Sequence, residues 1–383
     1  MNTQPRFSPS LIREVANSAA GRTDVLPFWF GESDRATPEF IREAAIESLR
    51  EGETFYSENL GRPHLRQAIS TYLTGLHSLP IGVDRIAATS SGVSALMLTC
   101  QLLVSPGDRV VAITPLWPNA VEIPKVVGGV VECVSLEAQD GRWSLPMGKL
   151  LDALSPGTRM LVINSPNNPT GWTISSEEQK TILEHCRRLG IWILADDVYE
   201  RLVYIEGMKS APSFLTIAEA EDRVIIVNSC SKSWTMTGWR VGWMVVPTSV
   251  VADLAALIEF NTSCVAEFSQ RAATKAILDG ESYVQQLRAE LAETKSRLTA
   301  AIRVLPGIEV PEADGAMYLF LRIDGEKDSV SLAKRLIQQV GLGLAPGRAF
   351  GPEGEGWLRW CYAAQWTKNE LGVERLAAFL AQG

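Results

Sequence analysis

The sequence predicts an α/β fold: a large domain whose mostly parallel, seven-stranded sheet is sandwiched by helices, plus a smaller α+β domain built from both chain termini. Short apolar runs alternate with longer helical patterns from about residue 85 to 246, which is typical of a parallel sheet covered on both faces. Beyond Val265 the pattern changes to a long charged helical stretch. The 383 residues also exceed what one small core needs, so more than one domain is expected.

Seven apolar runs are the predicted strands of the large sheet. They are Ile86–Ala88, Val110–Ile113, Val130–Val134, Met160–Ile163, Ile191–Ala195, Val224–Val227 and Val241–Val246. One helix between them has clear ends, because Ser175 offers an N-cap, Glu177 and Glu178 an acidic first turn, and Gly190 a stop signal. A second helix is expected from Ala95 to Val104.

The two chain ends predict a separate layer. The charged helical stretch runs to about Arg303, and a strand around Met317–Leu321 and a helix over Val330–Val340 follow it. The first forty-odd residues fit neither this pattern nor that of the large sheet. We therefore expect a large domain over residues 46–270 and a discontinuous small domain over residues 1–45 and 271–383.

Composition narrows the class of protein. Hydrophobic residues make up 46% and charged residues 21% of the chain, as in ordinary globular enzymes, and the net charge of -8 argues against a nucleic-acid partner. Met1–Phe7 contains no apolar signal core, and no run is long enough to cross a membrane. The six cysteines lie far apart, without metal-ligand spacing, which favours a reducing compartment and a cytoplasmic protein with no metal site.

Polar side chains follow three neighbouring apolar runs. Asn168 follows Met160–Ile163, Asp196 and Tyr199 follow the next run, and Ser229 and Lys232 follow Val224–Val227. Ligands of open α/β sheets bind beyond the carboxyl ends of the strands, so these groups are expected at one rim.

A further segment is expected at the same rim. Ser91, Gly92 and Val93 stand at the start of a helix, where free amides and the helix dipole suit a phosphate.

These groups together predict pyridoxal phosphate chemistry. A buried lysine can form a Schiff base with the cofactor aldehyde, and an aspartate such as Asp196 pairs with the pyridine nitrogen. Asn168 and Tyr199 can bond the phenolic oxygen of the ring. The phosphate suits Arg240, the Ser229 hydroxyl and the amides of Gly92 and Val93.

In the order and spacing of its motifs, the chain resembles the fold-type I, class I/II aminotransferases, most closely the branch of bacterial aspartate and aromatic aminotransferases. The matching segments cover almost the whole chain: Phe30-Gly31-Glu32-Ser33-Asp34 with Thr37-Pro38, Tyr56 with Gly61 and Leu65-Arg66, Asn167-Asn168-Pro169-Thr170-Gly171, Asp196 with Tyr199, Ser231 to Gly242, Ala345-Pro346-Gly347 with Phe350-Gly351, and Leu358-Arg359.

The resemblance implies roles for further residues. Lys232 would form the aldimine and shuttle the proton in amino transfer from an L-amino acid to a 2-oxo acid through pyridoxamine phosphate. Trp117 would stack on the ring. Tyr56 would reach the cofactor of the neighbouring subunit, which implies a homodimer. Arg359 would bind the substrate carboxylate in a pocket that the Gly31 backbone also lines.

The sequence departs from the family pattern at three positions. Arg35 stands where the family usually has an aromatic residue, Arg348 where it has a small one, and Met317 where it has Phe. Either arginine could meet an acidic substrate side chain or lie in solvent.

Other chemistries on the same cofactor stay open at this point. A carbon-sulfur lyase, a decarboxylase or a racemase would start from the same carbanion. The Ser-x-x-Lys pattern at Ser229 also fits penicillin-recognising serine hydrolases, but their companion Ser-Asp-Asn and Lys-Thr-Gly motifs are missing. A dinucleotide dehydrogenase lacks its Gly-x-Gly-x-x-Gly fingerprint.

Overall fold

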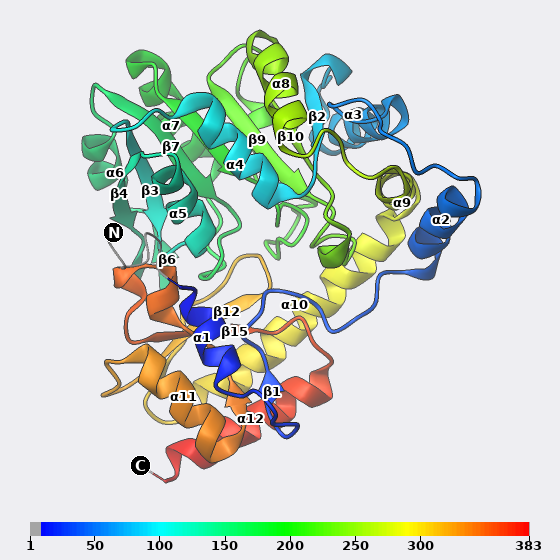
Figure 1. Cartoon of the computed structure of the whole chain (residues 1–383). Coiled ribbons are helices and arrows are strands. Elements are labelled where there is room, and N and C mark those ends of the chain that lie inside the picture. Colours follow the sequence, from blue (N-terminus) through cyan, green and yellow to red (C-terminus); the bar gives the residue numbers. More distant parts are fainter. Residues whose placement is uncertain (1–8, 383) are drawn as a thin grey trace, which may run out of the picture.

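The computed structural model describes residues 9–382 and confirms the α/β fold with a seven-stranded sheet (Figure 1). The strand order is β2-β10-β9-β8-β7-β3-β4. Neighbours run parallel except β10, which is antiparallel to both β2 and β9. Each predicted apolar run corresponds to one strand: β2 Ile86–Thr89, β3 Arg109–Thr114, β4 Val130–Ser135, β7 Thr158–Asn164, β8 Trp192–Asp196, β9 Val224–Ser229 and β10 Gly242–Val245.

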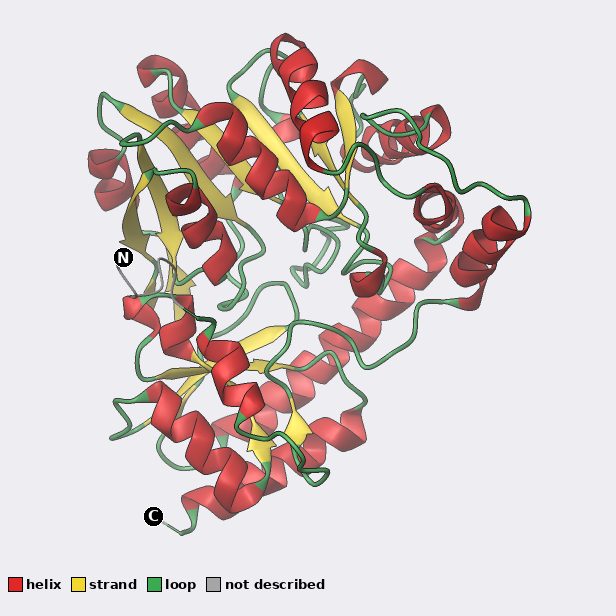
Figure 2. Cartoon of the chain, in the orientation of Figure 1, coloured by secondary structure: helices red, strands yellow, loops and turns green. Residues whose placement is uncertain are grey.

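Helices cover both faces of this sheet (Figure 2). Along β7, Met160 and Val162 join one apolar core, whereas Leu161 and Ile163 join the other, because successive side chains of a strand point to opposite faces. The first core includes α4 Gly92–Leu103, α5 Pro118–Val126 and α8 Val251–Asn261; the second includes α3 Pro63–His77, α6 Met147–Ala153, α7 Ser176–Leu189 and α9 Glu267–Asp279. Because both faces of strands such as β7 are buried, their sequences are unbroken apolar runs and do not alternate between apolar and polar residues.

Helix α7 begins and ends as the sequence predicts. The Ser175 hydroxyl accepts a hydrogen bond from the Glu178 amide, and the Glu178 carboxylate accepts one from the Ser175 amide, which completes a capping box. Gly190 follows the helix with a φ of 69°, in the left-handed region that glycine adopts without strain.

Both chain ends contribute to a second, antiparallel sheet and its surroundings. Its order is β11-β12-β15-β14, formed by Ile308–Glu309, Tyr318–Ile323, Trp357–Cys361 and Ala345–Pro346. Beside it β1 (Leu26–Pro27) pairs in parallel with β13 (Leu342–Gly343). The helices of this region include α1 Leu11–Asn17, α11 Ser329–Val340 and α12 Trp366–Leu380. A separate hairpin joins β5 (Glu137–Gln139) to β6 (Arg142–Ser144).

The charged stretch beyond Val265 forms two helices, not one. Helix α9 ends before Gly280, and α10 runs over Glu281–Arg303. A Cβ at Gly280 would lie 2.7 Å from the indole nitrogen of Trp234, so glycine permits the close packing at this break.

The predicted domain boundaries at 45/46 and 270/271 fall inside α2 (Glu39–Arg50) and α9, which pack against each other. Met1–Phe7, where the sequence shows no apolar signal core, lies outside the described residues. Among residues 9–382, no helix combines the length and apolar character that a membrane crossing requires.

Candidate active site

A cleft of about 540 Å³ lies at the carboxyl edge of the large sheet, and residues near the second sheet close its other side. Strands β7, β8 and β9 end at this edge, since Asn164 pairs with Asp196, and Asp196 with Val227. Most of the residues predicted from the sequence line the cleft: Gly31, Gly92, Val93, Trp117, Asn168, Asp196, Tyr199, Ser229, Lys232, Arg240 and Arg359.

Lys232 projects its amine into the cleft from the loop after β9. Its Nζ donates a hydrogen bond to the Gly31 carbonyl and lies 5.8 Å from the centroid of the Tyr199 ring. Burial lowers the pKa of this amine to about 8. About a tenth of Lys232 is therefore neutral and nucleophilic at pH 7, far more than for an ordinary lysine.

Asp196 is a buried carboxylate at the end of β8, only 6% exposed. One oxygen accepts a 3.3 Å hydrogen bond from the Val198 amide. Burial raises the pKa of Asp196 to about 7, and the positive charge of Lys232 only partly opposes this shift. The adjacent Asp197 lies outside the lining and accepts a 2.7 Å hydrogen bond from the Ser213 hydroxyl. Of the two aspartates, Asp196 alone faces the cleft.

Arg359 is the buried cation of the cleft, only 2% exposed on β15. Its guanidinium donates to Asn168 Oδ1 at 3.0 Å and to the Trp29 carbonyl, and its Nε has no partner among the described residues. No carboxylate of residues 9–382 lies within 4.0 Å of it. A buried charge of this kind is costly unless a ligand supplies the counter-charge.

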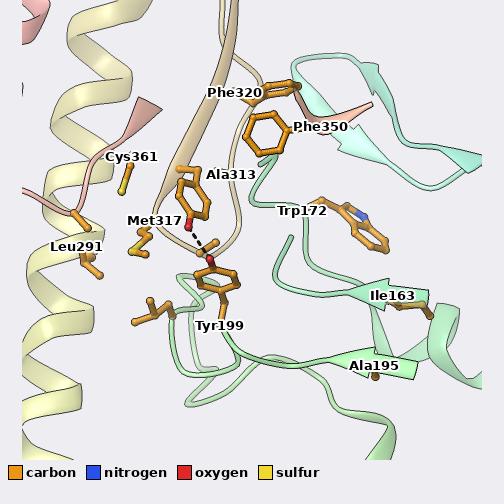
Figure 3. Close-up of a cluster of buried hydrophobic side chains, with 14 of the residues drawn as sticks. Ile163, Trp172, Ala195, Tyr199, Leu291, Ala313, Met317, Phe320, Phe350 and Cys361 are labelled. Atoms are coloured by element: carbon orange, nitrogen blue, oxygen red, sulfur yellow. Dashed lines mark hydrogen bonds between the residues drawn. The ribbon is translucent and has the colours of Figure 1, made fainter. Parts of the chain in front are cut away.

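Tyr199 is held by a second tyrosine. Its hydroxyl and that of Tyr318 lie 2.6 Å apart, shown as the dashed line in Figure 3. Tyr318 also packs on the Arg359 guanidinium, 4.5 Å from its ring centroid. A Cβ at Gly31 would lie 2.2 Å from the Tyr318 hydroxyl oxygen, so glycine at position 31 lets the backbone pass close to this pair.

The opposite end of the cleft has the features of an anion site. The first residues of α4, Gly92 and Val93, line it together with Ser229 and Arg240, and the amides of a helix N-terminus bind anions. Strand β10 approaches this terminus closely, because a Cβ at Gly242 would lie 2.6 Å from the Gly92 nitrogen.

Ser91 does not line the cleft. Its hydroxyl caps α4 by accepting a 3.1 Å hydrogen bond from the Ser94 amide. Its backbone has a φ of 117° and a ψ of 163°, a combination that is strained for any residue but glycine and is found mainly at functional sites.

Three further arginine and tyrosine residues named from the sequence lie outside the cleft. Tyr56 is exposed and absent from the lining. Arg35 forms an ion pair with Glu290 on α10. The guanidinium of Arg348 is half exposed and its Nε lies 4.0 Å from Glu355. Within one protomer, neither arginine is placed to meet a substrate.

The structure also adds residues that the sequence analysis missed. Asn164 bonds the Asn168 amide at 2.8 Å and the Asp196 carbonyl at 2.9 Å, so it joins the loop after β7 to the end of β8. Its place at a strand end could have identified it. Tyr318 follows Met317, and Arg13 lies on α1; both line the cleft, but no spacing in the sequence marks them.

Comparisons with known proteins decide the family. A family model described as aminotransferase class I and II matches residues 23–377. The chain belongs to the class I and II aminotransferases. It is 34% identical to an aspartate aminotransferase of Pyrococcus horikoshii, over 96% of this chain and 93% of that protein.

Two further comparisons agree. A probable aspartate/prephenate aminotransferase of Aquifex aeolicus is 32% identical, over 99% of this chain and 97% of that protein. The solved structure of an aspartate aminotransferase from Thermotoga maritima matches with a TM-score of 0.90 at 29% identity, covering 98% of each chain. The predicted aminotransferase activity is confirmed, and nothing in these comparisons favours a lyase, decarboxylase or racemase.

Pyridoxal phosphate is the cofactor of this family and therefore of this aminotransferase. The residues present fit it. Asp196 is a buried anion that lacks a positive partner at bonding distance, which a protonated pyridine nitrogen provides. The α4 N-terminus suits the phosphate. Among residues 9–382, no cluster of three His, Cys, Asp or Glu side chains is arranged to hold a metal ion.

Proposed function

We propose that Lys232 carries the reacting proton while this aminotransferase moves the amino group of an L-amino acid to a 2-oxo acid. One observation carries the assignment: Lys232 shares its cleft with a buried anion, Asp196, and a buried cation, Arg359, neither of which has an opposite charge at bonding distance among residues 9–382. When bound, pyridoxal phosphate supplies an aldehyde for the amino group and a ring that withdraws electrons from the substrate α-carbon.

The other side chains position the reactants. Arg359 binds the substrate α-carboxylate with two parallel charge-assisted hydrogen bonds, and Asn168 orients the guanidinium. Asp196 would accept a hydrogen bond from the protonated ring nitrogen of the cofactor. Lys232 Nζ, with its lowered pKa, would accept the proton lost by the substrate α-carbon and donate it to the carbon of the former cofactor aldehyde.

The remaining groups hold the cofactor. Trp117 would cover one face of the ring, and the Tyr199 hydroxyl would donate a hydrogen bond to the phenolic oxygen. Ser229, Arg240 and the amides of Gly92 and Val93, which line the same cleft, would bind the phosphate. Ser91 caps α4 and so supports these amides. We therefore propose that it acts indirectly, without the direct phosphate contact expected from the sequence.

We also propose a cytoplasmic homodimer in which Tyr56 reaches the phosphate of the partner's cofactor. Exposure of Tyr56 and its neighbour Phe55 supports an interface at this loop. All six cysteines are free thiols, as suits a reducing compartment. We further propose that a large domain and a discontinuous small domain meet at the C-terminal ends of α2 and α9, near Arg50 and Asp279.

Amino transfer is tested by following the nitrogen atom. The holoenzyme is supplied with an α-15N-labelled L-amino acid and an unlabelled 2-oxo acid, and the products are analysed by mass spectrometry. We expect 15N in the newly formed amino acid, and loss of this transfer in Lys232→Ala. Release of the label as ammonia would instead indicate a lyase.

A further inference from the structure

Helix α1 places an arginine at the cleft. Ile12 and Arg13 both line it, together with Phe30. The helix is anchored on its other side, where Val15 is fully buried and Glu14 pairs with Lys334 of α11 at 2.6 Å. The Ser10 hydroxyl caps the helix by accepting from the Arg13 amide. Arg13 is therefore presented to the cleft by an anchored element near the second sheet.

The guanidinium of Arg13 has no counter-charge in the described chain. No carboxylate of residues 9–382 lies within 4.0 Å of it, and it rests 5.8 Å from the centroid of the Phe30 ring. A contact of this kind with an aromatic ring leaves the N–H donors of the guanidinium free for a planar anion. The side chain is exposed, so the cost of holding the charge there is low.

The other charges of the cleft already have partners or proposed roles. Its remaining cations are Lys232, Arg240 and Arg359, which serve the proton, the phosphate and the α-carboxylate. Its acids are Asp196, assigned to the ring nitrogen, and Glu32, which accepts a 3.2 Å hydrogen bond from the Thr237 hydroxyl. One positive charge in contact with the cleft is left over.

We propose that Arg13 binds an anionic group on the substrate side chain and so selects amino acids and 2-oxo acids that carry a second carboxylate. This inference rests on the proposed function, because it needs Arg359 to take the α-carboxylate. It assigns to Arg13 the role that the sequence offered to Arg35 or Arg348, neither of which lines the cleft.

Kinetics on near-isosteric donors tests the inference. Initial rates of the holoenzyme are measured with L-aspartate against L-asparagine and with L-glutamate against L-glutamine. Removing one charge-assisted hydrogen-bond donor should lower kcat/KM of Arg13→Gln for the acidic donors by about ten- to a hundred-fold. For L-asparagine and L-glutamine, kcat/KM should change by less than about two-fold, since Arg13 binds their uncharged side chains weakly. Arg13→Lys should keep part of the preference.

Arg348→Gln is the matched control, because it removes an exposed arginine that, unlike Arg13, does not line the cleft, and it should leave all four rates unchanged. Equal losses for acidic and amide donors in Arg13→Gln, or no loss for either, would overturn the inference. A wild-type enzyme that prefers the amide donors would overturn it as well.

A binding measurement separates this inference from the proposed function. Succinate and butyrate, which differ by one carboxylate, are titrated into wild-type and Arg13→Gln holoenzyme by calorimetry. We expect Arg13→Gln to weaken succinate binding about ten-fold or more and to leave butyrate unchanged. A succinate affinity that is equal in the two proteins would contradict the role of Arg13. No amino transfer by wild type with any donor would contradict the proposed function, whatever the titration shows.

Discussion

Asp196 carries an electrostatic cost that depends on pH. In the unfolded chain its carboxyl has the ordinary pKa of 3.8, and burial raises the folded value to about 7. Below pH 3.8 both states bind the proton and the group has no effect. Between 3.8 and about 7 only the unfolded state loses the proton, so the folded apoenzyme becomes progressively less stable, and above 7 the cost is complete.

We therefore predict that Asp196→Asn stabilises the apoenzyme above pH 7 by up to about 4 kcal/mol, and that this gain shrinks as the pH falls toward 5. Chemical denaturation of cofactor-free protein at a series of pH values measures it. Asp152→Asn, at an exposed position of α6, serves as the control. A gain that is constant with pH, or a loss at high pH, would contradict this account of Asp196.

The rate at which the apoenzyme takes up its cofactor should also depend on pH, through the protonation state of Lys232. Its amine must be neutral to attack the cofactor aldehyde, and its pKa is lowered to about 8. The rate of cofactor uptake by the apoenzyme should rise about ten-fold from about pH 7 to about pH 9 and then level off. Stopped-flow absorbance measures this rate. A midpoint near 10 would show that burial does not lower the pKa of this amine.

The sequence identifies the site residues that directly follow buried strands. Asp196 ends β8, and Lys232 comes three residues after β9, so strand periodicity and rim position were enough to group them. Arg359 required the resemblance, because an arginine inside an apolar strand has no local pattern that names its ligand. Arg13 was missed because α1 has only seven residues, too few for a helical period to show which side faces the cleft.

At the level of the elements, glycine positions set how closely β10 approaches α4. A Cβ at Gly242 would lie 2.6 Å from both the Gly92 nitrogen and the Ser91 carbonyl carbon, and 2.8 Å from the Asn228 carbonyl oxygen. All three are backbone atoms, which cannot rotate away. We predict that Gly242→Ala destabilises the protein by several kcal/mol, on the order of other overpacked core sites, and weakens cofactor binding by displacing the α4 N-terminus.

Gly75→Ala is the matched comparison. Gly75 lies inside α3, and a Cβ there would meet nothing within 4 Å. This substitution should stabilise the protein by about 0.5 to 1 kcal/mol, the usual helix preference of alanine over glycine. Urea unfolding of both variants gives the two free energies. Similar effects from the two substitutions would show that crowding at Gly242 is not the cause.

Element prediction succeeded where apolar runs have sharp ends and failed where a tertiary contact decides. The seven strands and the capped helix α7 follow from local patterns. The antiparallel direction of β10 does not follow from such a pattern. Parallel strands are usually joined through an α-helix, and the connection from β9 to β10 contains none. The break at Gly280 depends on Trp234, which is far away in sequence.

At the scale of the whole molecule, a group of exposed aromatic side chains indicates a surface for association. Phe55, Tyr56 and Phe260 are 81%, 84% and 84% exposed. The loop that carries Phe55 and Tyr56 is tied to α8 through a 3.4 Å hydrogen bond from Asn59 to the Ala255 carbonyl, and Phe260 lies near the end of that helix. Large aromatic surfaces of this kind mark association sites in otherwise soluble folds.

We predict that wild type sediments as a dimer at micromolar concentration and that Phe260→Asp sediments mainly as a monomer, because a charge would be buried in the interface. Val304→Asp is the control, since Val304 is 81% exposed at the end of α10, away from this loop. Sedimentation velocity distinguishes the species. A wild-type monomer would contradict the proposed dimer. A Phe260→Asp variant that remains dimeric would show that the interface lies elsewhere.

The sequence could establish the layers and the cofactor chemistry of the molecule, but not how its two sheets meet. Contacts such as Tyr199 to Tyr318 and Asn168 to Arg359 join residues more than a hundred positions apart. Such contacts depend on the packed fold, and single-sequence periodicity carries no information about them.

The most direct measurement is chemical trapping of the cofactor. Holoenzyme is reduced with borohydride and digested, and the phosphopyridoxyl group is located by mass spectrometry. The structure predicts modification of Lys232 alone, with none in Lys232→Ala protein treated in the same way. Modification of a different lysine, or an unmodified chain that still transfers amino groups, would contradict the central claim.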